Sequence, residues 1–139
     1  MDDKKKLELL NSIIPNTLME TLDIKYTEVG EGFLVATMPV NSRVHQPLGL
    51  LHGGASLALA ESVASTASHF LIDGYQYENR GLEMSANHLK SVRSGLVTAT
   101  ARVIHKGRTT HLWEIRIVDA QNNLVTLCKL TNIVLPKSK

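Results

Sequence analysis

The sequence predicts an α+β fold in which a curled antiparallel sheet of about six strands wraps around one long central helix. Two observations carry this prediction. A long helical pattern of small apolar residues occupies residues 55–71, and segments of alternating polarity lie on both sides of it, two before and four after. One helix buried against an antiparallel sheet covers the apolar faces of both elements.

Length and composition indicate one globular domain over residues 1–139. The hydrophobic fraction of 43% and the charged fraction of 20% are typical of a globular chain that buries a core. A net charge of +2 and few aromatic residues do not suit a nucleic-acid surface. The longest apolar stretch, residues 48–72, contains His52, Glu61 and two glycines, so it is a poor membrane span. We expect neither a nucleic-acid nor a membrane partner.

The amino terminus and the cysteine content indicate a cytoplasmic protein. Residues 1–15 are charged and amphipathic, without the apolar core and cleavage site of a signal peptide. Cys128 is the single cysteine, so no disulfide can form within the chain, which suits a reducing compartment. We interpret Cys128 as a small strand residue, because nothing near it in the sequence would activate a thiol.

Before the long helix, the pattern predicts a short helix and a hairpin. Residues 3–13 place apolar side chains on one side, and Pro15 ends this helix. A further helical turn begins at residues 16–17. From Asp23 the period becomes two, which predicts two strands joined by the glycine-rich turn at residues 30–32.

After the long helix, alternation continues to the end of the chain. Residues 73–81 form a polar connection, and glycine-rich or asparagine-rich segments then separate four strands. The last two strands show the clearest alternation of apolar and polar residues. We place the four strands at residues 82–93, 95–106, 110–119 and 123–135.

Glu61 is the one carboxylate of the long helix. It lies within the apolar sequence LALAESVASTA, where an unpaired buried charge would cost several kcal/mol, so we favour a functional role over a solvated surface role. Ser65 follows one turn later on the same face. Gly53 and Gly54 precede Glu61 by about two turns and place exposed backbone N–H groups at the positive end of the helix dipole.

The segment QPLGLLHGGAS, which leads into AES at residues 46–62, resembles a signature of hotdog-fold acyl-CoA thioesterases of the PaaI-like branch. The resemblance covers nearly the whole chain, from Pro15 to the strand containing residues 130–131. It is greatest with the 1,4-dihydroxy-2-naphthoyl-CoA thioesterases of menaquinone synthesis and their near relatives. The resemblance implies a thioester hydrolase that converts an aromatic or medium-chain acyl-CoA into free acid and CoA.

The resemblance also implies roles for the residues of this signature. The Gly53 N–H would bind the thioester oxygen, assisted by Gln46. Glu61 would act as nucleophile or as general base, two mechanisms between which the sequence does not choose. Ser65 would position water, and His52 would orient the thioester or the loop through hydrogen bonds.

Coenzyme A is part of the substrate and carries three phosphate groups. Its candidate partners lie at the helix start, at the end of the next strand and around a Lys-Gly-Arg turn, where basic and hydroxyl groups suit anions. The histidines lack the spacing of a metal site, so we expect neither a metal nor another cofactor. The candidate CoA contacts are Gly54, His88, Lys90, Arg93, Lys106, Arg108, Thr109 and Thr110.

Two alternatives to a thioesterase stay open. A hotdog-fold dehydratase or hydratase pairs a loop histidine with a helix carboxylate, and His45 or His52 with Glu61 would imitate that pair. The segment QPLGLLHGG nevertheless lacks the HFPG-type loop of acyl-carrier dehydratases. A noncatalytic acyl-CoA-binding dimer would keep the nucleotide contacts but would not need Glu61.

Exposed sheet edges predict a homodimer. Two sheets joined edge to edge would cover both edges and help to cover the site. The resemblance implies that Glu61 faces Gln46 of the partner subunit in a shared active site. It also implies a tetramer built as a dimer of dimers.

Overall fold

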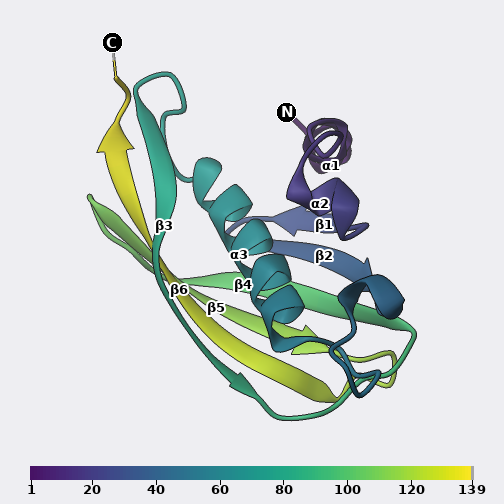
Figure 1. The fold of residues 1–139 in the computed structure, drawn as a ribbon. Helices are drawn as coiled ribbons and strands as arrows, with labels where there is room; N and C mark the ends of the chain where they lie inside the picture. Colours follow the sequence, from purple (N-terminus) through teal and green to yellow (C-terminus); the bar gives the residue numbers. More distant parts are fainter. Residues whose placement is uncertain (139) are drawn as a thin grey trace.

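The computed structural model of the chain describes residues 1–138. Two short helices and a hairpin precede the long helix, and four strands follow it, which is the predicted order (Figure 1). The elements are α1 (Asp3–Ser12), α2 (Leu18–Thr21), β1 (Lys25–Gly30), β2 (Phe33–Pro39), η1 (Ser42–Val44), α3 (Gly53–His69), β3 (Tyr77–His88), β4 (Leu96–Lys106), β5 (Thr110–Val118) and β6 (Leu124–Pro136).

The six strands form one antiparallel sheet in the order β1-β2-β4-β5-β6-β3. The sheet curves around α3, which lies on its concave side (Figure 1). The buried side of α3 includes Ala60, Val63 and Ala64, and the sheet contributes larger side chains such as Trp113 and Ile115. Small helical residues opposite large strand residues allow close packing. The predicted α+β arrangement of one helix inside a curled sheet is confirmed.

The long helix begins two residues before its predicted start at Ala55. His52 caps it, because its Nδ1 accepts a hydrogen bond of 2.8 Å from the Gly54 N–H. This cap lets both glycines adopt the helical conformation from Gly53 onward. None of the helices in residues 1–138 is long and apolar enough to cross a membrane.

The largest difference from the sequence prediction concerns β3. The prediction placed a connection at residues 73–81 and a strand at 82–93, whereas β3 pairs with β6 from Tyr77 to His88. Its register shifts between Gly81 and Glu83, which breaks the alternation on which the prediction relied. β3 is also an edge strand with a mostly exposed surface. Its first and last residues are therefore determined by pairing with β6 and not by a hydrophobic pattern in its own sequence.

Hydrogen bonds of Tyr26 on β1 connect the amino-terminal region to the sheet and to α3. The Asn11 side chain exchanges two hydrogen bonds of 2.9 Å with the Tyr26 backbone. The Tyr26 hydroxyl reaches Thr66 Oγ1 on α3 at 2.9 Å, and burial raises the pKa of this phenol. In the same region, Leu18 and Met19 of α2 line a depression on the exposed side of α3.

Candidate active site

The first turn of α3 leaves one backbone donor without a partner. His52 accepts three N–H groups, one at its Nδ1 from Gly54 and two at its carbonyl from Ala55 and Ser56, at 2.8, 3.0 and 3.2 Å. Among the described residues, the Gly53 N–H has no hydrogen-bond acceptor. Gly53 therefore supplies a free donor at the positive end of a 17-residue helix.

The His52 side chain caps the helix and does not line the cavity beside Gly53. Because its Nδ1 accepts the Gly54 N–H, the proton of the neutral ring is on Nε2. The ring lines a depression with Arg43, His45 and Gly54, separate from the cavity that Gly53 lines. The Gly54 N–H, which we predicted as a CoA contact, is already occupied by His52.

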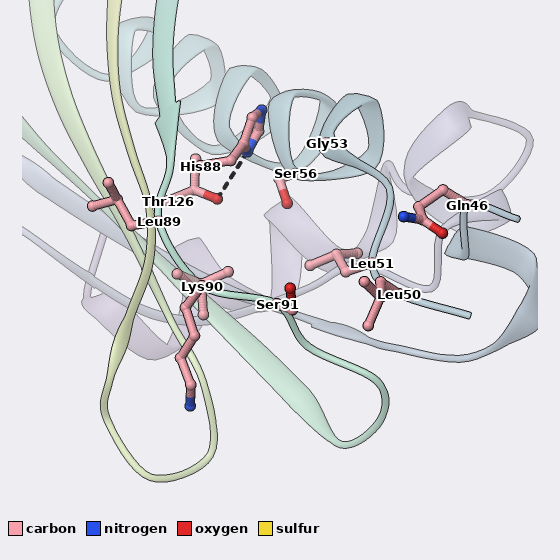
Figure 2. A pocket seen from close by; sticks show the side chains of 11 residues that line it. Gln46, Leu50, Leu51, Gly53, Ser56, His88, Leu89, Lys90, Ser91 and Thr126 are labelled. Carbon is pink, nitrogen blue, oxygen red and sulfur yellow. Dashed lines mark hydrogen bonds between the residues drawn. The ribbon is translucent and has the colours of Figure 1, made fainter. Parts of the chain in front are cut away.

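A cavity of about 340 Å³ opens beside Gly53 (Figure 2). The His88 ring covers the glycine so closely that a Cβ at position 53 would lie 2.9 Å from His88 Nε2. Thr126 Oγ1 holds the other ring nitrogen of His88 at 3.3 Å. The predicted residues Gln46, Gly53, His88 and Lys90 all line this cavity, with Ser56 as a buried wall.

Gln46 belongs to a tight loop that presents its amide to the cavity wall. Its backbone N–H donates to Leu50 at 2.8 Å, and its carbonyl accepts from Gly49 at 3.0 Å. Gly49 has a φ of +76°, which glycine adopts without strain. The side-chain Oε1 accepts from the Leu48 N–H, so the NH₂ group is left as a donor. Gln46 and Gly53 thus bring two donors to one cavity.

Glu61 and Ser65 line a second depression of about 400 Å³ on the exposed side of α3. The Glu61 carboxylate lies against β3, because a Cβ at Gly81 would be 2.8 Å from Glu61 Oε2. Gly81 therefore makes room for the carboxylate, a role that the sequence interpretation missed. A glycine inside a strand is a sign of such a close approach, but we had assigned Gly81 to a connection.

One protomer does not bring the two donors and the carboxylate into one cavity. Gln46 and Gly53 line the cavity at the start of α3, whereas Glu61 and Ser65 line the depression farther along the helix. The two sets lie on one helix but belong to different surfaces.

Lys90 makes an ion pair with Asp119 in the turn between β5 and β6. This ammonium, followed by the Asn123 N–H, lowers the pKa of the Asp119 carboxyl to about 2. Figure 2 shows the Lys90 side chain directed away from Gly53 and Gln46. Arg93 instead meets the Gln46 loop, where its Nη1 lies 3.5 Å from the Leu48 carbonyl.

The other candidate CoA contacts lie at the opposite end of the sheet. Thr110 and Arg80 both pair with Ile133, and Arg80 precedes His88 by eight residues on β3. At about 3.3 Å per residue this is roughly 26 Å along the strand. Lys106, Arg108 and Thr109 line a separate pocket of about 460 Å³. The predicted anion contacts of one protomer therefore form two groups.

The described part of the chain contains neither a metal-binding cluster nor an activated thiol. No group of three His, Cys, Asp or Glu side chains in residues 1–138 could hold a metal ion. Cys128 is buried, and burial raises its pKa to about 11, so the thiol stays protonated at neutral pH.

Comparison with known proteins identifies the family. Residues 48–126 match the family model of the thioesterase superfamily. The chain is 42% identical over 132 residues to the 1,4-dihydroxy-2-naphthoyl-CoA hydrolase of Escherichia coli, with 95% of this chain and 96% of that protein covered. It is 43% identical over 129 residues to the proofreading thioesterase EntH of Cronobacter turicensis, with 93% of each covered. A crystal structure of a mutant thioesterase from Pseudomonas aeruginosa matches with a TM-score of 0.92 at 48% identity, covering 94% of each chain. The chain therefore belongs to the thioesterase superfamily and has the hotdog fold.

Proposed function

We propose that this enzyme hydrolyses acyl-CoA thioesters, with the Gly53 N–H and the Gln46 NH₂ group binding the carbonyl oxygen and Glu61 providing the attack. The observation that carries this proposal is the unpaired Gly53 N–H, which lines the same cavity as a second amide donor. Two donors at one oxygen stabilise the charge that develops there, and removal of one such donor typically costs about 10²- to 10³-fold in rate.

Glu61 suits two routes that share their products. As a base, it takes a proton from water, the hydroxide adds to the thioester carbon, and the C–S bond breaks to release CoA thiolate, which takes up that proton. As a nucleophile, its oxygen displaces the thiolate to form a mixed anhydride, which water then cleaves to restore the carboxylate. Ser65 lines the same depression and would hold the water in either route.

The complete site would form between two protomers. β3 is a twelve-residue edge strand, and Leu82 and Tyr77 on it are 60% and 40% exposed. Pairing through this edge would extend the sheet and cover these apolar side chains. Because Glu61 lies against Gly81 of β3, such a dimer would bring its carboxylate close to the subunit interface. The family resemblance suggests that Gln46 of the partner subunit would face it there. Two dimers would then form a tetramer, as the family resemblance suggests.

The phosphates of CoA would contact basic groups from both protomers. His88, Lys90 and Arg93 lie near the cavity at the start of α3, and the Lys106–Thr110 turn lies at the far end of the sheet. One ligand would therefore meet the first group from one protomer and the turn from the other. The Lys90 ammonium would bind a phosphate together with, or in place of, Asp119.

The acyl group we propose is aromatic or of medium chain length. The cavity beside Gly53 has apolar walls from Leu50, Leu51 and Val125, which suit a flat or short hydrophobic group. The name of the E. coli relative refers to a naphthoyl-CoA, which supports an aromatic substrate and a place in menaquinone synthesis.

The test is CoA release, followed with a thiol reagent, from benzoyl-, hydroxynaphthoyl-, phenylacetyl- and aliphatic acyl-CoAs. We expect Glu61→Ala to lower kcat by about 10²- to 10⁴-fold, the usual contribution of a general base. Glu28→Ala, which changes an exposed glutamate on β1, is the matched control and should leave the rate unchanged. Buried Cys128 will add little signal.

Absence of turnover across the panel would overturn the proposed function. Equal turnover in wild type and Glu61→Ala would keep the thioesterase activity but reject Glu61 as the catalytic carboxylate.

A further inference from the structure

A buried group of polar side chains lies directly behind Ser65. Its centre is Ser68 Oγ on α3, which lies 2.6 Å from Trp113 Nε1, 2.7 Å from Asn132 Nδ2 and 3.0 Å from His111 Nδ1. Asn132 continues the chain of contacts, because its Oδ1 accepts a hydrogen bond of 3.2 Å from Ser65 Oγ. Ser68, His111, Trp113 and Asn132 are each at most 1% exposed.

With the Asn132 NH₂ group placed toward Ser68, hydrogen-bond capacity assigns a direction to every bond in this group. The Ser68 hydroxyl has two acceptor positions and one proton. The Trp113 and Asn132 N–H groups fill both acceptor positions, so the proton must point to His111 Nδ1, which is then unprotonated. Burial, followed by the nearby Lys106 charge, lowers the pKa of His111 and favours this neutral ring. The Asn132 amide is thereby oriented with its oxygen toward Ser65.

We infer that Asn132 is a positioning residue that fixes Ser65 as a hydrogen-bond acceptor on its exposed side. The Ser65 proton is engaged by Asn132 Oδ1, so only lone pairs of the hydroxyl oxygen face the depression that Glu61 also lines. A water in that depression can donate one hydrogen to Glu61 and the other to Ser65. Its own lone pair is then directed away from both and toward the thioester carbon.

This inference rests on the proposed function and specifies how the water would be held. The reverse arrangement of the group would have His111 donate from Nδ1, Ser68 donate to Asn132, and the Asn132 NH₂ donate to Ser65. Ser65 would then be free to donate to the lone pair of the water, which would weaken the water as a nucleophile. The tautomer of His111 therefore shows whether the Ser65 hydroxyl accepts or donates a hydrogen bond on its exposed side.

The first measurement needs no activity. Two-bond ¹H–¹⁵N correlation spectra of histidine-labelled protein at neutral pH distinguish the two tautomers, and His111→Gln identifies the signal. We expect His111 to carry its proton on Nε2. A proton on Nδ1 would overturn the inference, whether or not any acyl-CoA is hydrolysed.

The second measurement is a double-mutant cycle of Asn132→Leu and Ser65→Ala with the best substrate of the panel. We expect Asn132→Leu to lower kcat by about 10- to 100-fold, the range for partners that orient a reacting group, with little change in KM. In the Ser65→Ala background it should cause no further loss, because it acts through Ser65. Cys128→Ala is the control, since Cys128 is buried on the same strand without a polar partner.

Additive losses in the cycle would overturn the positioning role, as would an equal loss of kcat in Cys128→Ala. Absence of turnover in wild type would instead reject the proposed function, and the tautomer measurement would still decide the polarity of Ser65.

Discussion

The two ends of α3 differ in how completely their polar groups are hydrogen-bonded. At the start of the helix, His52 binds three N–H groups and leaves that of Gly53 unpaired beside the cavity. Near its end, the Ser68 hydroxyl binds three side chains from β5 and β6. In residues 1–138, no buried side-chain nitrogen or oxygen lacks a hydrogen-bond partner.

Solvent access explains this difference. An unpaired donor at an open cavity can bind water and stays available to a ligand, whereas a buried unpaired group costs about 1–3 kcal/mol. The unpaired Gly53 donor at the solvated start of α3 therefore stays available to a ligand. The polar groups at the buried end bind one another, and Ser65 lies between the two ends.

Ser68→Ala should have the largest effect, because it removes the hydroxyl on which the buried group is centred. The substitution leaves Trp113 Nε1, Asn132 Nδ2 and His111 without their shared partner, so we expect a loss of about 3 kcal/mol in the free energy of unfolding. Urea denaturation measures it. Ser62→Ala is the control, because Ser62 Oγ donates only to the Ala58 carbonyl of the same helix, at 2.7 Å. Equal losses in both variants would mean that the buried group adds no stability of its own.

A smaller effect is expected at the start of the helix. His52→Ala removes the cap from the Gly54 N–H and should lower the free energy of unfolding by about 1 kcal/mol. His52→Asn should restore most of the loss, because asparagine is a good capping residue. Thermal and urea unfolding of the two variants decide this. If Asn destabilises as much as Ala, the histidine ring contributes through packing rather than through the hydrogen bond.

The smallest effect concerns the turn between β5 and β6, where Lys90 forms an ion pair with Asp119. The pKa of Asp119 is lowered from 3.8 to about 2, so this carboxylate stabilises the folded state above pH 4 and loses that contribution as the pH falls from about 4 to about 2. Asp119→Asn should flatten the pH dependence of the urea midpoint in this window. An unchanged slope would assign the acid sensitivity to other carboxylates.

The sequence predicted the elements whose pattern is local. The hairpin at residues 30–32 is confirmed, since β1 and β2 pair up to Gly30 and Phe33 around a two-residue turn. The strands β5 and β6 also agree within one residue at each end, because each buries one face. The start of β3 was wrong, because an irregular edge strand carries little alternation.

The residues of the candidate site also divide into those that the local sequence pattern predicted and those that only the structure shows. Gln46, Gly53, Glu61 and Ser65 were found from the helix pattern and the family signature, and their catalytic roles remain predictions. The contacts of Gly81 with Glu61 and of Asp119 with Lys90 join residues 20 and 29 positions apart, and no local period reports them.

By itself, the sequence determined the fold class, the order of elements and the helix that carries Glu61, because helical and strand periods are properties of neighbouring residues. Only the tertiary structure decided that His52 leaves the Gly53 N–H unpaired and that Ser65 is held through Asn132. The hydrogen bond that holds Ser65 depends on which polar groups the curled sheet brings together from positions 43 to 67 residues apart. The free Gly53 N–H depends instead on the conformation around His52, whose contacts span two to four residues, and on whether water can reach it.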